Sequence, residues 1–211
     1  MTNIIPAILE NNFEEIKRKL SILEDLSDWA QIDISDGIFT PRRSWMTADD
    51  LKEITGQIKI EVHLMVDKPE EYLFKWSEVA DAITVHWEAL NSEPSELIEA
   101  IKVNNCRPGL AFNLDTPLEE AYRYIEEVKF VQLMAIEKIG YQGQVFSDKV
   151  LERIRAVKKN CPNSFIQIDG GIDLETGQLC LSAGADALVV GSALWQNDSI
   201  SVKLKELKNI K

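Results

Sequence analysis

The chain has 211 residues, 45% of them hydrophobic, with a formal net charge of −12 and a sequence pI near 4.7. A chain of this length can bury one sizeable core, so a single domain over residues 1–211 is expected. The acidic balance argues against nucleic acid or an anionic membrane surface as a partner, because binding on that scale needs a basic surface. A small phosphorylated ligand stays possible, since backbone amides can hold a phosphate.

The cysteines and the first residues both point to a reducing compartment. The three cysteines form no C-x-x-C motif and are an odd count, so they are expected to be reduced packing residues: Cys106, Cys161 and Cys180. The segment Met1–Leu9 lacks the basic start and long apolar stretch of a signal peptide, and no apolar run approaches the length of a membrane span. A cytoplasmic location is therefore expected.

Short apolar runs alternate with helical patterns along the whole chain. The runs predict strands at 4–9, 29–34, 58–66, 82–86, 107–113, 130–136, 164–168 and 187–190. Between them lie predicted helices, with Asn12, Ser147 and Asp173 as caps and with Pro69 and Pro117 in the first turns; the last helix is expected from about residue 198 to the C-terminus.

Strict alternation of strands and helices predicts a parallel sheet, and eight repeats of it predict a closed (β/α)8 TIM barrel. The alternative is a doubly wound open sheet. The barrel is favoured because no glycine-rich fingerprint follows the first strand.

Two of the predicted strands end in carboxylates where a buried strand should have none. The stretch 29–37 carries Asp33 and Asp36, and the stretch 165–172 carries Asp169 before two glycines. An ionised carboxylate in such a place is unfavourable unless a cation, a metal or a substrate meets it. In a barrel both strands deliver their side chains to the same rim, so Asp33 and Asp169 are candidates for an acid/base pair. The structural alternative is that Asp33 pairs with a neighbouring lysine or arginine.

The only two histidines of the chain, His63 and His86, also fall at strand ends. Together with the two aspartates they predict a functional cluster. If side chains keep alternating past the end of the strand at 82–86, His86 and Glu88 point the same way, so they can form a hydrogen-bonded pair, or His86 can serve as a substitute metal ligand. The first arrangement is favoured.

Paired small residues mark a candidate phosphate site. Gly170 and Gly171 precede a helix start, and Gly191 and Ser192 precede the last predicted helix. Backbone amides at such turns can bind a phosphate without side-chain charge, which suits an acidic protein. Trp45, Trp87 and the Arg42–Arg43 pair fall in predicted loops and could cover the site or form a subunit contact; a homo-oligomer is expected.

Seven blocks in order resemble the ribulose-phosphate 3-epimerase family over nearly the whole chain. They are Pro6–Leu9, Ile32–Gly37, Val62–Met65, Thr84–Ala89, Gly140–Gln144, Ile168–Ile172 and Gly184–Ser192. The resemblance implies a barrel of the ribulose-phosphate-binding type that moves a proton at C3 of a phosphorylated ketose with the help of a divalent metal.

The resemblance also implies residue roles. Asp33 and Asp169 match the acid/base pair, which also binds the metal. His63 matches a metal ligand at the substrate site, and Gln31 stands where the family has the remaining ligand, a histidine. The other substrate-binding positions implied are Ala7, Met65, Met134, the loop residues Gly140, Tyr141, Gln142 and Gly143, and the phosphate-binding residues Gly170, Gly171, Gly191 and Ser192.

The departures from the family pattern bear on activity. An amide oxygen at Gln31 is a weaker metal donor than imidazole, so weaker binding of the cation is expected, with zinc, manganese, iron and cobalt not distinguished. Ala7 replaces a serine, Ser35 replaces a methionine, and the loop 137–143 differs from the family's Asn-Pro-Gly-Phe-Gly-Gly.

The implied function is interconversion of D-ribulose 5-phosphate and D-xylulose 5-phosphate by a metal-dependent isomerase of carbohydrate metabolism, in the pentose phosphate pathway. The open alternatives are a phosphosugar-binding barrel with weak or lost turnover and an epimerase for a related ketose phosphate, such as a hexulose 6-phosphate. A lyase or decarboxylase barrel is disfavoured, because no lysine is predicted at a strand end.

Overall fold

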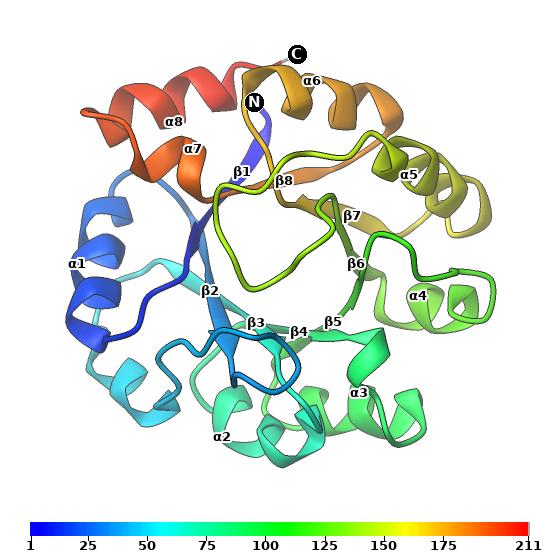
Figure 1. The fold of residues 1–211 in the computed structure, drawn as a ribbon. Helices are drawn as coiled ribbons and strands as arrows, with labels where there is room; N and C mark the ends of the chain where they lie inside the picture. The colour runs from blue at the N-terminus through cyan, green and yellow to red at the C-terminus, as the bar shows by residue number, and fades with distance from the viewer. Residues whose placement is uncertain (211) are drawn as a thin grey trace.

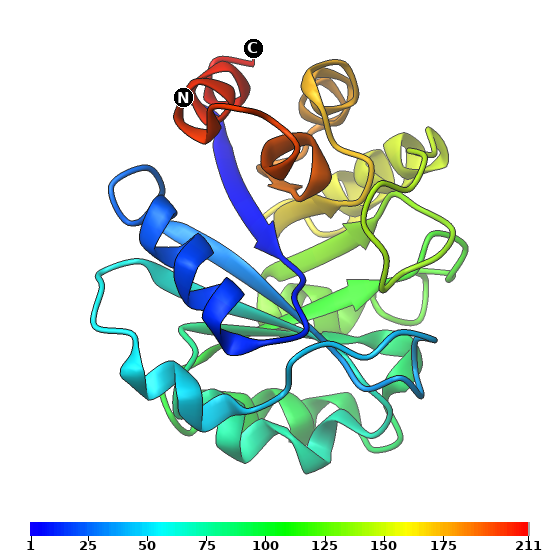
Figure 2. The ribbon, with the colours of Figure 1, turned by 60° about the vertical axis from the view of Figure 1, so that its left-hand side comes forward.

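The fold is a closed parallel barrel in the computed structural model, which describes residues 1–210; Lys211, the last residue of the predicted final helix, lies outside the described residues. The strands pair in the order β1 to β8, and β1 pairs with β8 to close the ring. Figure 1 shows the ring of strands with helices around it, and Figure 2 shows the same arrangement from the side. The predicted (β/α)8 barrel is confirmed.

All the predicted strands are present, with differences only at their ends. Their bounds are β1 Asn3–Ile8, β2 Trp29–Ser35, β3 Lys59–Met65, β4 Ala82–His86, β5 Arg107–Phe112, β6 Phe130–Met134, β7 Phe165–Asp169 and β8 Ala187–Val190. The short apolar runs could be located from sequence because strands of a parallel barrel are apolar toward the helices and end in turn residues.

The helical segments are α1 Phe13–Leu23, η1 Ala48–Glu53, η2 Pro69–Glu71, α2 Leu73–Ser77, η3 Trp87–Ala89, α3 Pro94–Lys102, α4 Tyr122–Val128, α5 Lys149–Asn160, α6 Leu174–Ala183, α7 Ser192–Trp195 and α8 Ile200–Lys208. Two predicted caps are confirmed. The side chain of Asn12 accepts from the Glu15 amide at 3.0 Å, and that of Asp173 accepts from the amides of Glu175 and Thr176 at 2.9 Å each.

Two helix starts were predicted wrongly. Pro117 does not open α4, which begins only at Tyr122; proline suits the corner of a turn as well as a first helical turn. Ser147 does not cap α5, which begins at Lys149 with Asp148 in the N-cap position; the Ser147 amide donates to the Ala135 carbonyl at 2.8 Å. The last helix begins at Ile200, close to its predicted start at about residue 198, whereas the separate short helix α7 before it was not predicted.

Alternate residues of each strand face opposite sides of the barrel wall, and the two sides differ in chemistry. The outward side chains pack with the helices into one continuous apolar core, which includes Ile32, Val62, Leu64, Ile83, Leu110, Leu133, Ile168 and Leu188. Inside the ring, a small apolar cluster lies on β1 and β8, made of Ile5, Ala7, Ala187 and Val189. Strands β2, β3, β4, β6 and β7 carry buried polar side chains: Gln31, Glu61, His63, Thr84, His86, Gln132 and Gln167.

The loop tryptophans and the cysteines are packing residues. Trp45 stacks on Phe13 at 5.4 Å between ring centroids, and Trp87 stacks on Phe112 at 5.8 Å. The three cysteines are free and buried, as predicted. Within residues 1–210, no helix combines the length and the apolar character that a membrane crossing requires.

Candidate active site

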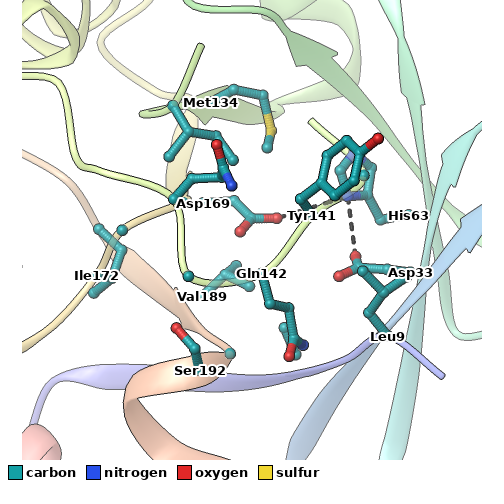
Figure 3. Close-up of a pocket in the computed structure, with 18 of the residues that line it drawn as sticks. Leu9, Asp33, His63, Met134, Tyr141, Gln142, Asp169, Ile172, Val189 and Ser192 are labelled. Carbon is teal, nitrogen blue, oxygen red and sulfur yellow. Dashed lines mark hydrogen bonds and ion pairs between the residues drawn. The ribbon is translucent and has the colours of Figure 1, made fainter. Parts of the chain in front are cut away.

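Three side chains that the sequence placed at strand ends converge at the mouth of the barrel. Asp33 on β2, His63 on β3 and Asp169 on β7 offer ligand atoms that all lie within 4.8 Å of one another. His63 Nδ1 lies 3.2 Å from Asp33 Oδ1 and 3.6 Å from Asp169 Oδ2. Figure 3 shows the three groups facing one pocket. No lysine or arginine in the described part of the chain forms an ion pair with either aspartate, so the structural alternative for Asp33 is not what the structure shows.

Gln31 joins the two aspartates through its amide nitrogen. Its Nε2 donates to Asp33 Oδ1 and to Asp169 Oδ2, both at 2.8 Å. A side-chain amide nitrogen has two hydrogens, so one Gln31 satisfies one oxygen of each carboxylate. In this orientation the group that faces the carboxylates is a donor, whereas a metal ligand would have to present its oxygen.

A second layer of polar side chains lies beneath this one. Gln132 Nε2 donates to Asp169 Oδ2 at 2.9 Å, and Gln167 Nε2 lies within hydrogen-bond distance of both amide oxygens, 3.1 Å from that of Gln31 and 2.8 Å from that of Gln132. The three amides are fully buried. Buried polar groups are normally hydrogen-bonded because desolvation would otherwise be uncompensated, and this network supplies partners for the amide atoms other than Gln167 Oε1.

His86 and Glu88 form the hydrogen-bonded pair that the sequence favoured. His86 Nδ1 lies 3.1 Å from Glu88 Oε2, and His86 Nε2 lies 2.9 Å from His63 Nε2. A carboxylate only accepts, so the His86 proton belongs on Nδ1 and its Nε2 accepts from the Nε2–H of His63. The pair therefore fixes the His63 ring with Nδ1 toward the aspartates, as a second layer commonly does for a ligating histidine.

The charges in this cluster shift one another's protonation. Burial and then the charge of Asp33 raise the pKa of Asp169 to about 7. Burial lowers the pKa of His63, but the hydrogen bond and charge of Asp33, together with the charge of Asp169, outweigh burial and raise it. Burial lowers the pKa of His86. The site thus contains a carboxyl that titrates near neutrality, as a proton-transfer group should.

A divalent cation fits three of the four predicted ligands. Two carboxylates and one imidazole are common donors for the transition metals, and three protein ligands suffice for a catalytic metal with open positions. Gln31 is adjacent to the same atoms, but its amide nitrogen and not its oxygen points toward them.

The predicted substrate residues line one pocket above the cluster. Its wall contains Ala7, Met65, Met134, Gly140, Tyr141, Gln142, Gly143, Gly170, Gly171, Gly191 and Ser192, together with Asp33, His63 and Asp169. The cavity has a volume of only about 50 Å³. Figure 1 shows the loop between β6 and α5 over the mouth of the barrel, and Figure 3 shows Tyr141 and Gln142 of that loop among the side chains that line the pocket.

Gly171 could not be replaced by a larger residue, and the turn at Gly191 is covered by a side chain. Gly171 has φ +65°, and a Cβ there would come within 2.7 Å of the Phe146 backbone nitrogen. A Cβ on Gly191 would lie 3.3 Å from Gln142 Nε2, so the Gln142 amide lies directly over this turn.

The sequence interpretation missed the buried amide layer and several wall residues. Glu61, Gln132 and Gln167 stand two positions before His63, Met134 and Asp169, so the two-residue period of a strand could have predicted that they face inward. The additional wall residues are Leu9, Ile136, Gln144, Ile172 and Val189. Among the described residues lining this pocket, neither Asp36 nor Ser35 occurs. Asp36 instead accepts from the amides of Ile38 and Asp67 at 2.8 and 2.7 Å.

The fold and site together define a (β/α)8 barrel with a carboxylate pair and an imidazole at its mouth. The sequence profile of the Ribulose-phosphate 3 epimerase family matches residues 3–195, and the chain belongs to that family. It is 33% identical to the ribulose-phosphate 3-epimerase of Methanocaldococcus jannaschii over 99% of this chain and 90% of the relative. It is 32% identical to the cytoplasmic isoform of ribulose-phosphate 3-epimerase from Oryza sativa subsp. japonica, over 91% of this chain and 86% of that protein. Among solved structures, 3-hexulose-6-phosphate synthase from Salmonella typhimurium has the same fold, with a TM-score of 0.72 and 17% identity over 99% of this chain and 98% of the synthase.

Proposed function

We propose that this protein is a ketose-phosphate 3-epimerase that interconverts D-ribulose 5-phosphate and D-xylulose 5-phosphate. The observation that carries the proposal is the pairing of Asp33 and Asp169 across one small pocket, in a chain that belongs to the epimerase family. Relatives named ribulose-phosphate 3-epimerase align over nearly the whole chain, which supports the same substrate here.

Inversion at a carbon beside a carbonyl needs a base on one face and an acid on the other. In the proposed reaction one aspartate removes the C3 proton and the other, protonated, returns a proton to the opposite face. The raised pKa of Asp169, about 7, supports its presence as the acid while Asp33 accepts. The amides of Gln31 and Gln132 hold the carboxylates in place.

Asp33, His63 and Asp169 are the proposed ligands of a divalent cation. When bound, such a cation would polarise the substrate carbonyl and offset the charge of the enediolate. The remaining roles belong to the pocket wall: the amides at Gly171 and Ser192 for the phosphate, with Gly170 and Gly191 beside them.

Further proposals concern the other substrate contacts and the whole protein. Ala7, Met65 and Met134 form the proposed wall of the sugar site, and Gly140, Tyr141, Gln142 and Gly143 form its proposed cover.

One domain is proposed for residues 1–211, supported by the single closed barrel. A homo-oligomer is supported by exposed apolar side chains such as Phe74 and Ile38. A cytoplasmic location is supported by the free cysteines and by the rice relative named as a cytoplasmic isoform.

The test is hydrogen exchange at C3 of D-ribulose 5-phosphate in deuterated water with added Mn²⁺. The wild type should place deuterium in both epimers. Asp33→Asn and Asp169→Asn should each lower epimerisation by at least about a thousandfold, because a site with one proton-transfer group cannot invert the centre. Each single variant can still exchange the proton of one epimer, from the face whose aspartate remains.

The matched control is Asp36→Asn, which changes an aspartate of the neighbouring loop that does not line the pocket. It should retain most of the activity. Absence of exchange by the wild type with several ketose phosphates, while sugar phosphate still binds, would instead establish a phosphosugar-binding barrel without turnover.

A further inference from the structure

The direction of the Gln31 side-chain amide is set by its neighbours on both ends. Its nitrogen lies 2.8 Å from one oxygen of Asp33 and 2.8 Å from one oxygen of Asp169. Its oxygen accepts from Gln167 Nε2 at 3.1 Å. Turning the amide over would place an oxygen against two carboxylates and a nitrogen against another donor, so the other orientation is disfavoured at both ends.

Gln132 is held in the same direction. Its nitrogen donates to Asp169 Oδ2 at 2.9 Å, and its oxygen accepts from Gln167 Nε2 at 2.8 Å. Gln167 is therefore the common donor behind both amides. These three side chains, Gln31, Gln132 and Gln167, form what we call the amide cluster, and each of them is fully buried.

The direction of Gln167 is set in turn by Glu61. Gln167 Nε2 lies 3.0 and 3.1 Å from the two Glu61 oxygens, and Thr84 Oγ1 donates to the same carboxyl group at 2.8 Å. The Gln167 nitrogen has two hydrogens, which are shared among the Glu61 carboxyl group and the oxygens of Gln31 and Gln132; an oxygen in its place would meet these acceptors without a hydrogen to donate, so the nitrogen stays turned toward them. Gln167 Oε1 has no hydrogen-bond partner among residues 1–210, which shows that the nitrogen end alone determines the orientation.

This arrangement opposes a cation at the mouth of the barrel. A cation that binds Asp33 and Asp169 meets the N–H groups of Gln31 and Gln132, and Gln31 becomes a ligand only after its amide turns over. We propose that Gln167 is a positioning residue that holds both amides with their donors toward the aspartates and thereby weakens divalent-cation binding at Asp33, His63 and Asp169. The inference rests on the proposed function for the identity of the cation site and adds how this chain regulates it.

The test is calorimetric titration of Mn²⁺ into metal-stripped protein. Gln167→Met keeps the length of the side chain and removes the donor, so Gln31 and Gln132 become free to turn their oxygens toward the cation. We expect Mn²⁺ to bind about tenfold more tightly, the effect of roughly one hydrogen bond. Gln57→Met, on an exposed loop residue, is the control and should leave the affinity unchanged. A purely structural role for Gln167 predicts equal or weaker binding in Gln167→Met, and that result would overturn the proposal.

A thermodynamic cycle tests whether the effect passes through the two amides. In a Gln31→Leu, Gln132→Leu background neither amide remains, so Gln167→Met should lose most of its effect on Mn²⁺ affinity. An unchanged tenfold effect in that background contradicts the proposal.

A measurement on the wild type covers the case in which Gln167→Met does not fold. Zn²⁺ is diamagnetic, and its binding should shift the side-chain amide signals of Gln167 in ¹⁵N-resolved NMR, because Gln31 has to turn. Signals that stay in place at Zn²⁺ saturation refute the inference. Both tests read cation binding alone, so a protein without epimerase activity but with the Mn²⁺ effect would refute only the proposed function.

Discussion

Asp169 is the residue whose surroundings differ most from those of an ordinary carboxyl group. It accepts from two amides, Gln31 and Gln132, and lies beside the second carboxylate of the pair. Amide donors stabilise the charged form, but burial and the charge of Asp33 outweigh them, and the pKa rises to about 7. A proton shared between two carboxylates is how such a pair holds one acid and one base at the same pH.

This shift predicts how stability depends on pH in the metal-free protein. The ordinary pKa of Asp169 is 3.8 and its folded value about 7, so between these values the folded state binds more protons than the unfolded state. The free energy of unfolding should therefore fall as pH rises through this window and level off above it. The raised pKa of His63 acts in the same direction. The measurement is urea unfolding with a chelator at a series of pH values.

The comparison for this prediction is Asp169→Asn, which has no proton to lose at that position. Its free energy of unfolding should depend less steeply on pH over the same window than that of the wild type. Equal slopes in the two proteins would mean that Asp169 titrates near its ordinary value.

At the scale of elements, the loop from the end of β6 to α5 controls access to the site. The pocket beneath it measures about 50 Å³, whereas ligand pockets typically have volumes of about 300 Å³ or more, so the loop has to move before a sugar phosphate enters. Gly140 has φ +83° and Gly143 φ +73°, backbone angles that glycine adopts without strain. Between them, Gln142 places its amide over Gly191.

The position of Gln142 predicts a role in holding the phosphate. Gln142→Gly should raise KM for D-ribulose 5-phosphate by about tenfold with little change in kcat, because a donor to a charged group is lost from both ground and transition states. Val145→Gly is the matched control: it adds a glycine to the same loop at a side chain that is 87% exposed. A lower KM in Gln142→Gly would show that the amide obstructs the phosphate site.

At the scale of the whole molecule, stability and chemistry lie on opposite faces of the same strands. On β3, His63 faces the polar interior while its neighbour Leu64 is fully buried in the apolar core between strands and helices. Burial of the outward side chains stabilises the barrel, and this frees the inward positions for carboxylates, imidazoles and amides that stabilise the fold less.

This division predicts that Leu64→Ala lowers stability and leaves catalytic activity nearly unchanged. It should lower the free energy of unfolding by about 2–5 kcal/mol, as the loss of a buried leucine usually does, with kcat within about twofold of the wild type. Leu64→Met conserves volume and should lower stability by less than about 1.5 kcal/mol. Chemical denaturation and steady-state kinetics give both quantities, and a large fall of kcat in a folded Leu64→Ala protein would show that the two faces are coupled.

Much of the molecule followed from local patterns in the sequence. The alternation of short apolar runs with helical segments determined the barrel, and the position of Asp33, His63 and Asp169 at strand ends determined that they would meet at one rim, because parallel strands of a barrel end on the same side. The predicted contact of His86 with Glu88 is present, but Glu88 lies in η3 beyond the end of β4, so the path of the chain after the strand brings it to His86. The helix starts predicted at Pro117 and Ser147 were wrong because proline and serine are also common in turns.

Only the tertiary structure decided how the polar side chains inside the ring are oriented. Whether Gln31 presents nitrogen or oxygen depends on Gln167, which is 136 positions away in the chain, and through it on Glu61. A side-chain amide is a donor at one end and an acceptor at the other, so its direction is a property of its neighbours and not of its own residue type. The covering of Gly191 by Gln142 is decided in the same way, by the path of a loop whose ends lie on different elements from the turn it covers.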